Sequence, residues 1–226
     1  KVYLSLRIGE SALYVNDRKF SVLTYYGQRR PSEEIGGEGN NKLASPSEQA
    51  DRIKFDHVIE DVRQFLVGVG GRSEKEKWQH HEMLNRAILG FSEERKRLLA
   101  MINDFLIKKR IHDAESPNRN YETLAEAVFA EVVGLNVLEL ILKDKEGLEE
   151  IQVVGTSIFE VRGGIPRPSI HTFRSTDEVE QIQQNLVLFN QDTLNARKKW
   201  AEVRLNDGSR VTLTGFGFTA QPTLTI

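Results

Sequence analysis

The sequence predicts an α+β protein in which helices precede an antiparallel sheet and also cover it. Three observations carry this prediction. Apolar residues recur at helical spacing through most of 51–110, and short runs with two-residue alternation fill much of 149–226. A helix with a capping signal separates two groups of these runs, which is the arrangement of a sheet backed by helices.

The composition limits the class of protein. With 226 residues the chain has room for one or two domains of about 100–200 residues each, and we expect two. The formal net charge of −2 gives no overall basic field that would attract nucleic acid or acidic lipid. The absence of cysteine excludes disulfides and thiolate chemistry and fits a reducing compartment. No window approaches the roughly 18 apolar residues of a membrane span, so we expect a cytoplasmic protein.

The first fifty residues are expected to form a small β-element and a linker. Two-residue alternation through 2–26 indicates two or three short strands, two of them joined by Asn16-Asp17, in a unit at 1–30. Periodicity is then lost, and Gly, Pro, Ser, Asn and charged residues dominate. Residues 31–50 are therefore predicted to be a linker or mobile loop.

A bundle of three antiparallel helices is predicted for 51–115. The first helix spans about 47–67 and the second about 75–89. Ser92 is the expected N-cap of the third helix, because acidic residues follow it and basic residues occupy the other end of the apolar stripe. Short loops between amphipathic helices favour antiparallel packing.

The remaining residues, 116–226, are predicted to form the α+β domain. Helices are expected at about 121–133 and 137–142, and then strands at 149–154, 157–162 and 169–173, with a Gly-Gly-Ile-Pro turn before the last. Ser175 and Glu178 form the sequence pattern of a capping box, which predicts a helix at 176–190.

The last strands form a hairpin. The runs AEVRL and RVTLTGF are joined by Asn206-Asp207-Gly208-Ser209, in which the Asp-Gly pair supplies the positive φ of a tight turn. The closing TLTI is predicted to be a strand with no cap or charged tail after it. We therefore expect the polypeptide to continue beyond Ile226.

Three segments resemble a known family in content and in order: GLNVLELIL at 134–142, EEIQVVG with SIFEVRGG in 149–164, and RLNDGSRV at 204–211 with the closing LTI. They are similar to the N-terminal half of the bacterial type II/type IV secretion ATPases, especially the branch that powers tight-adherence pili and related conjugation systems. Two positions depart from the family: Val154-Gly155 replaces the usual Asn-Gly, and 197–200 lacks the usual Pro. These departures affect the subfamily assignment more than the family.

The resemblance implies a PAS-like fold for 116–226, packed against a RecA-like ATPase domain across the nucleotide. It also implies a homo-hexamer that works with inner-membrane secretion machinery at the cytoplasmic face of the membrane. ATP and Mg would be bound by the full-length protein. The phosphate cradle G-x-x-x-x-G-K-[ST] is absent, since the nearest segment, GVGGRSEK at 68–75, has bunched glycines and no Gly-Lys-Ser/Thr. We therefore expect the parent protein to be an ATPase and this chain alone to bind no nucleotide and hydrolyse none.

Arg204 and Arg210 are the candidate site residues, as nucleotide contacts implied by the family's RLxDGSRV motif. A guanidinium stays charged and donates bidentate hydrogen bonds to phosphate oxygens, which suits a residue that stabilises a transferring phosphoryl group. The alternative is that both are exposed strand arginines that pair with Glu202 or Asp207. No catalytic residue and no metal ligand is predicted in the chain.

Other candidate motifs have plainer explanations. The glycines of 68–71 are predicted to form a helix-to-helix turn instead of a phosphate site. His80 and His81 point about 100° apart on a helix and lack convergent partners, so we expect surface or bundle-edge histidines and no metal site. The acidic pairs at 33–34, 93–94 and 149–150 are expected to solvate a linker, favour a helix start and solvate a strand, and not to form a catalytic couple.

Two features beside the hairpin leave alternatives open. The basic cluster of Arg197, Lys198 and Lys199 is expected in a solvated loop, or else in contact with phosphate or with an acidic partner surface. Trp200, Phe216 and Phe218 are expected to pack in the core or at an interface.

These inferences lead to one functional hypothesis and two alternatives. The chain is predicted to be the non-catalytic N-terminal region of a hexameric secretion or pilus-assembly ATPase, which caps the nucleotide site and couples hydrolysis to transport. The first alternative is a stand-alone interaction or scaffold module of a secretion apparatus without ATPase activity. The second is a small-molecule sensor that uses a PAS-like pocket.

Overall fold

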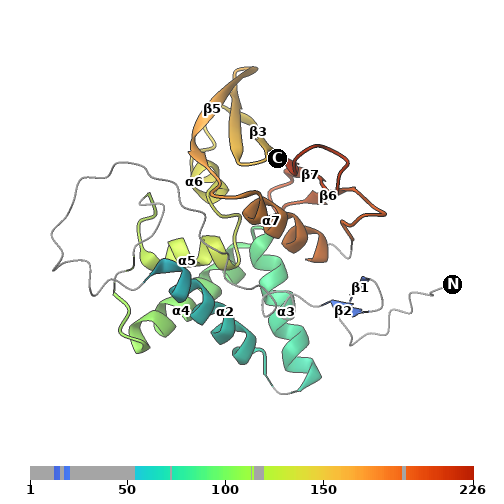
Figure 1. Ribbon diagram of the computed structural model, residues 1–226. Helices are drawn as coiled ribbons and strands as arrows, with labels where there is room; N and C mark the ends of the chain where they lie inside the picture. Colours follow the sequence, from blue (N-terminus) through green and yellow to red (C-terminus); the bar gives the residue numbers. More distant parts are fainter. Residues whose placement is uncertain are drawn as a thin grey trace.

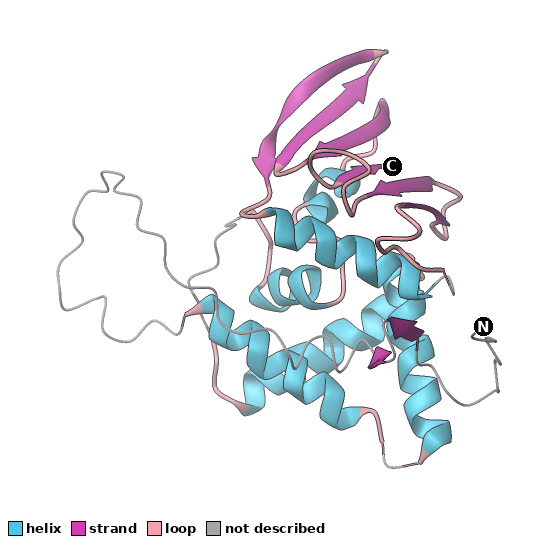
Figure 2. Ribbon diagram, turned by 45° about the vertical axis from the view of Figure 1, so that its right-hand side comes forward, coloured by secondary structure: helices cyan, strands magenta, loops and turns pink. Residues whose placement is uncertain are grey.

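The computed structural model describes residues 54–71, 73–112, 114, 120–189 and 192–226, and the backbone of two short strands near the start. Helices come first in this part of the chain, and a six-stranded sheet forms a second layer beside them (Figures 1 and 2). The predicted α+β class is confirmed. None of the helices in the described ranges is long and apolar enough to cross a membrane.

The two N-terminal strands form a small hairpin. β1 (Leu13–Val15) and β2 (Arg18–Phe20) are antiparallel, and Val15 is paired with Arg18. This register confirms the strands predicted on either side of Asn16-Asp17. The other predictions for 1–50, including the linker, lie outside the described residues.

Four helices form the first layer: α2 (Phe55–Val69), α3 (Glu74–Ile88), α4 (Ser92–Lys108) and α5 (Leu124–Val132). Their apolar faces meet in one core, whose most enclosed members are Val58, Val62, Ala87, Leu98, Ile102 and Val128. Fully burying a Leu or Val side chain stabilises a fold by about 1.5–3 kcal/mol, so this core holds the helices together. Helix α5 follows residue 115, yet its apolar side chains complete the helical core.

The turn between α2 and α3 shows why the first helix ends. Gly71 has φ +82°, and a Cβ there would lie 2.3 Å from the Glu76 Cβ, so glycine is required. The next helix begins with a capping box: Ser73 Oγ accepts from the Glu76 N–H at 3.2 Å, and Glu76 Oε2 accepts from the Ser73 N–H at 3.0 Å. The predicted helix-to-helix turn is confirmed.

Two predicted helix boundaries in this layer were wrong. Gly68 does not end α2 but lies inside it, because the left-handed residue that ends the turn is Gly71. The N-cap of α4 is Phe91, and Ser92 is already helical. The carboxylates of Glu93 and Glu94 still occupy the first turn, where they complement the helix dipole as expected.

The second layer is one sheet in the order β5-β4-β3-β8-β7-β6, and all neighbouring strands are antiparallel. Its strands are β3 (Leu148–Val154), β4 (Ser157–Arg162), β5 (Ile165–Thr172), β6 (Trp200–Arg204), β7 (Arg210–Thr214) and β8 (Thr223–Thr225). The last strand, β8, lies in the middle of the sheet. It joins the β6–β7 hairpin to the β3–β4–β5 meander.

The strand register divides the side chains between two faces. One cross-sheet row, in which every residue is at most 2% exposed, consists of Ala201, Leu213, Leu224, Val153 and Ile158. Because successive side chains of a strand point to opposite faces, the residues between these point away from the core. The sheet thus has one buried face and one open face.

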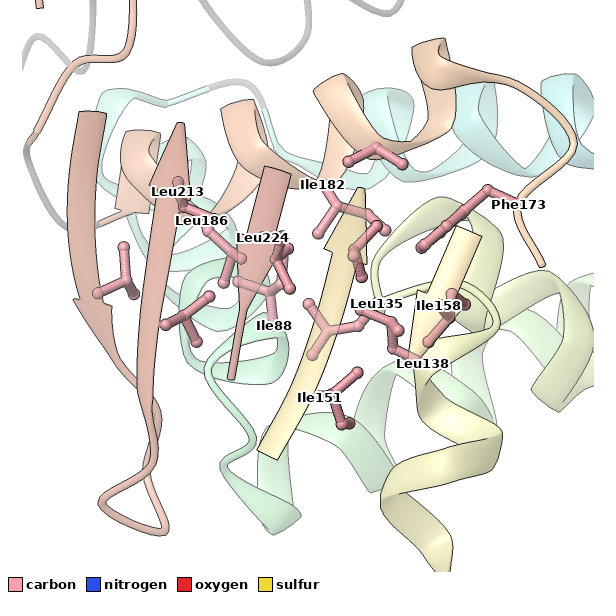
Figure 3. Close-up of a cluster of buried hydrophobic side chains, with 14 of the residues drawn as sticks. Ile88, Leu135, Leu138, Ile151, Ile158, Phe173, Ile182, Leu186, Leu213 and Leu224 are labelled. Atoms are coloured by element: carbon pink, nitrogen blue, oxygen red, sulfur yellow. The ribbon is translucent and has the colours of Figure 1, made fainter. Parts of the chain in front are cut away.

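Two helices cover the buried face. α6 (Leu138–Lys143) and α7 (Thr176–Phe189) contribute Leu138, Val179, Ile182 and Leu186 to the second core. Figure 3 shows Leu138, Ile182 and Leu186 directed toward the side chains of the sheet. Ile88, the last residue of α3, also belongs to this core. The helical layer and the sheet are therefore joined by apolar contacts as well as by the chain.

Two local predictions in the sheet unit were also wrong. The β4–β5 turn consists of Gly163 and Gly164, at φ +59° and +71°, while Ile165 and Pro166 already pair with β4. Before α7, the Glu178 carboxylate accepts from the Arg174 N–H at 2.9 Å, one residue earlier than the Ser175 N–H of a capping box.

One buried amide holds the middle of the sheet to α7. Gln183 is 1% exposed, and its Nε2 donates to the carbonyl oxygens of Thr214 at 2.9 Å and Thr223 at 2.7 Å. These two residues are paired at the point where β7 and β8 separate. The amide therefore supplies hydrogen bonds to the two backbone carbonyls at the end of the β7–β8 pairing.

We expect Gln183→Leu to lower the free energy of unfolding by about 1–3 kcal/mol, because it leaves two enclosed carbonyls without this donor. Urea denaturation followed by circular dichroism measures the change. Gln64→Leu is the matched control, since the Gln64 amide bonds only at the surface, to Glu60 at 3.2 Å. Equal midpoints for the two variants would contradict the role given to Gln183.

Candidate functional site

The open face of the sheet is polar at its centre and carries distinct groups at the two ends of the β6–β7 hairpin. A band of threonines occupies the centre: Thr212, Thr214, Thr223 and Thr225. Arg204 and Arg210 lie at one end, and Trp200 lies at the other, opposite Thr214. We refer to this surface as the open face.

Arg204 and Arg210 are direct cross-strand neighbours. They form the last registered pair before the loop, and both are exposed. Opposed residues of an antiparallel pair have Cβ atoms about 4.5–5.5 Å apart, so two positive side chains stand together on the same face. In the described part of the chain neither guanidinium pairs with a carboxylate.

The carboxylate expected to neutralise this pair is engaged elsewhere. Asp207 bonds to the Lys145 ammonium, which follows α6, and also accepts from the Ser209 N–H at 2.9 Å. The hydrogen bond from Lys145 lowers the pKa of Asp207 to about 2. The predicted pairing of an arginine with Asp207 is therefore not formed.

The loop between the two arginines is anchored to the helical layer. Gly208 has φ +89°, as predicted for the Asp-Gly pair, and its N–H donates to the Leu205 carbonyl at 3.0 Å. The Asn206 N–H donates to the carbonyl of Leu89, just after α3, at 2.7 Å. These bonds fix the backbone of the loop from which both arginines project.

This geometry is suited to binding an anion. Like charges placed directly opposite each other destabilise a strand pair, whereas an anion that accepts hydrogen bonds from both guanidinium groups removes the repulsion. Neither residue is a nucleophile or a proton donor at neutral pH, because arginine remains protonated. The pair can therefore bind and orient a phosphate group but cannot cleave one.

No metal site is found in the residues that the structure describes. His80 and His81 were predicted to be surface or bundle-edge histidines. His80 is not at the surface but buried, at 9% exposure, and burial lowers its pKa. His81 is half-buried, and its pKa is also lowered by burial. Neutral histidines enclosed in this way belong to the packing of α3.

The acidic pairs within the described ranges have structural partners. Glu94 bonds to the Arg86 guanidinium at 2.5 Å, and Glu93 lies 3.2 Å from the Lys96 ammonium. Glu149 accepts from the Gly164 N–H at 3.0 Å, and Glu150 accepts from the Gln152 amide at 2.9 Å. Glu33 and Glu34 lie outside the described residues.

The aromatic residues beside the hairpin are not in the core. Trp200, Phe216 and Phe218 are about half exposed, so only the interface alternative of the prediction remains open. In the preceding basic cluster, Arg197 is exposed as expected for a solvated loop, while the Lys198 ammonium lies 2.5 Å from Asp192.

A second charged cluster, which was not predicted, joins the two layers. The Arg174 guanidinium bonds to Glu178 on α7 at 2.5 Å, to both oxygens of Glu131 on α5 at 3.1 and 3.2 Å, and to Asp56 on α2 at 3.3 Å. These partners are 4, 43 and 118 residues from Arg174 in the sequence. No local pattern could have indicated their convergence.

Glu131 is the most perturbed carboxyl of this cluster. Its pKa is raised to about 7, chiefly by burial and also by the Glu178 and Asp56 carboxylates, while Arg174 and Arg63 act in the opposite direction. Three carboxylates share the one guanidinium of Arg174, so its charge does not offset all of them. The cluster is placed between α2, α5 and α7, away from the open face, and its role is to hold the layers together.

No protein-family model matches the chain, and no curated protein matches it in sequence. Among solved structures, the chain is similar to the VirB11 ATPase from the Brucella suis type IV secretion system, in complex with sulphate. The superposition has a TM-score of 0.35 and 13% identity, and it covers 39% of this chain and 28% of that chain. A likeness of this extent carries no argument about the site.

Replacing one arginine of the pair should relieve repulsion. We expect Arg204→Gln to leave the free energy of unfolding unchanged or to raise it by about 0.2–1 kcal/mol at low ionic strength. The gain should disappear at about 1 M salt, where the Debye length is about 3 Å. Arg167→Gln is the control, because Arg167 is registered opposite Glu160 and should give no gain. A loss of stability in Arg204→Gln at low salt would show that the pair is not repulsive.

The stability of the protein should fall as the pH rises from about 4.5 to about 7 through Glu131. Its pKa is raised in the fold, so the folded state retains a proton that the unfolded state has released over this window. Glu131→Gln should therefore flatten the pH dependence of the unfolding free energy by at least about 1 kcal/mol across the window. Denaturant titrations at several pH values test this, with the exposed carboxylate variant Glu180→Gln as control. Parallel pH profiles for the wild type and Glu131→Gln would contradict it.

Proposed function

We propose that the chain is the non-catalytic N-terminal region of a secretion or pilus-assembly ATPase, and that it caps the nucleotide site of a RecA-like domain elsewhere in the longer protein. One observation supports this most directly. Arg204 and Arg210 stand side by side on the open face, exposed and without a carboxylate partner in the described part of the chain. A repulsive pair held in this position fits an anionic ligand such as a nucleotide phosphate.

The hairpin provides a rigid support for this contact. Val203 and Val211, the neighbours of the arginines on the buried face, are fully enclosed. The loop is tied to Leu89 and Lys145, so little backbone conformational entropy remains to be lost when the guanidinium groups meet a phosphate. Guanidinium groups fixed where negative charge develops lower the barrier to phosphoryl transfer.

In this proposal the chain supplies positive charge, and the rest of the protein supplies the chemistry. ATP and Mg would be held by the phosphate cradle of the RecA-like domain, because this chain has no G-x-x-x-x-G-K-[ST] segment. The resemblance in sequence motifs implies six copies in a ring, at the cytoplasmic side of the membrane, in contact with secretion machinery. The cap would then open and close as a rigid body with the nucleotide cycle.

A stand-alone interaction module is the second candidate. The exposed aromatic residues at the other end of the hairpin favour it, because such residues are typical of interfaces. Translation of the reading frame beyond Ile226 separates the two candidates. The proposal requires a strand followed by G-x-x-x-x-G-K-[ST], and a stop codon in its place would rule it out.

We expect Arg204→Ala and Arg210→Ala each to lower the ATPase rate of the full-length protein on the order of 100-fold, because each removes a donor to developing negative charge. A coupled assay of phosphate release measures the rate. Arg167→Ala, at an exposed position on β5, is the matched control and should retain the wild-type rate. Wild-type rates in both hairpin variants would make the two arginines structural and refute the proposed contact.

A further inference from the structure

The aromatic end of the β6–β7 hairpin is unusual in its exposure. Trp200 is 53% exposed, Phe216 49% and Phe218 61%. The pairing of Trp200 with Thr214 and the bond from the Gly215 N–H to the Lys199 carbonyl, at 3.0 Å, bring the start of β6 beside the turn that carries Phe216 and Phe218. We call Trp200, Phe216 and Phe218 the aromatic corner.

The backbone of this corner is strained in a way that the core does not require. Phe216 has φ +52° and Gly217 φ +75°, and the Phe218 N–H donates to the Gly215 carbonyl at 3.1 Å. This is the geometry of a type I′ turn, whose first central position favours Asn, Asp or Gly. A phenylalanine there costs conformational energy and also leaves its ring in solvent, so packing does not explain it. Strain of this kind is typical of functional segments.

Basic residues immediately precede the corner. Arg197 is exposed, Lys199 is half-buried, and the Lys198 ammonium lies 5.9 Å from the centre of the Trp200 ring. The carboxylates nearest in the chain are Asp192, which pairs with Lys198, and Glu202 on β6. The corner is therefore positive as well as apolar, although the whole chain has a net charge of −2.

The chain offers an internal comparison. Trp78 on α3 is 52% exposed, and a second basic cluster, Lys108, Lys109 and Arg110, lies at the end of α4. These two features lie on different helices. In the described part of the chain, the aromatic corner is where an exposed tryptophan, two exposed phenylalanines and a basic cluster coincide.

We propose that the aromatic corner, with Arg197, Lys198 and Lys199, is a docking surface for an anionic lipid membrane. Tryptophan and phenylalanine rings enter the headgroup region of a bilayer, and nearby cations are attracted by acidic headgroups. Charge complementarity identifies the occupant, because three cations lie beside the exposed rings at this corner while the chain as a whole is slightly acidic. A short turn that presents two rings is suited to shallow insertion.

The docking surface does not depend on the proposed nucleotide contact. Trp200 and Arg204 lie at opposite ends of β6, about 13 Å apart along the strand at about 3.3 Å per residue. Variants at one end therefore test one proposal without testing the other. Loss of vesicle binding with a normal ATPase rate, and the reverse result, are separate outcomes.

Tryptophan fluorescence tests the proposal on the chain as it stands. Trp78→Phe leaves Trp200 as the single tryptophan, and its emission should shift to the blue on phosphatidylcholine vesicles that contain phosphatidylglycerol. The protein should sediment with these vesicles and not with pure phosphatidylcholine, and about 1 M salt should weaken binding. Trp200→Phe, which retains Trp78, should show no shift. Absence of both shift and sedimentation would overturn the proposal and leave the corner to a protein partner.

Two double variants separate the contribution of the phenylalanine rings to vesicle binding from that of the cations. Phe216→Asn with Phe218→Ser should abolish most vesicle binding while leaving the unfolding midpoint equal or higher, because asparagine relieves the turn. Arg197→Gln with Lys199→Gln should weaken binding by about fivefold per cation removed. Lys108→Gln with Lys109→Gln is the charge-matched control and should bind like the wild type. Binding that survives the phenylalanine variant, or that falls equally in the control, would refute the docking surface.

Discussion

The central position of β8 is the constraint on which the sheet depends. This three-residue strand pairs with β3 on one side and β7 on the other, and Leu224 at its centre is fully enclosed. Beyond the strand, Ile226 and Ile151 exchange both backbone hydrogen bonds at 2.9 Å. Without β8, a two-stranded hairpin and a three-stranded meander would each expose an edge, and an isolated hairpin is marginally stable in water. The amide of Gln183 adds a contact from α7 where β7 and β8 separate.

The candidate surfaces follow from this arrangement. Because β8 and β7 hold β6 in register, the apolar residues of the hairpin lie on the buried face, and Trp200 and the two arginines lie on the open face at opposite ends. The hairpin loop is tied to Leu89 and Lys145, so the arginine end is anchored to the helical layer. Arg174 anchors the sheet unit to the helical layer, because it precedes α7 and bonds to Glu131 on α5 and Asp56 on α2. The sheet that bears the open face is thus held in place against the helices.

Sequence reasoning found the two arginines of the candidate site but not their environment. The RLNDGSRV motif and the Asp-Gly turn predicted a hairpin that contains Arg204 and Arg210, and the structure contains that hairpin. That they stand directly opposite each other depends on the register of a loop with one left-handed glycine, Gly208. That Asp207 does not neutralise them depends on Lys145, which is 62 residues away. The exposure of Phe216 depends on a backbone conformation that an aromatic residue rarely adopts.

The sequence by itself determined the elements of this protein. Periodicity and turn residues act over a few positions, so they predicted the helices around 75–89 and 176–190 and the strand at 157–162 with bounds close to those observed. Tertiary structure alone decided that α5 joins the helical core, that the last strand lies at the centre of the sheet, and that Arg174 gathers carboxylates from three helices. Each of these rests on contacts between residues far apart in the chain. Their free energy comes from burial and charge pairing in the assembled fold, which no short stretch of sequence contains.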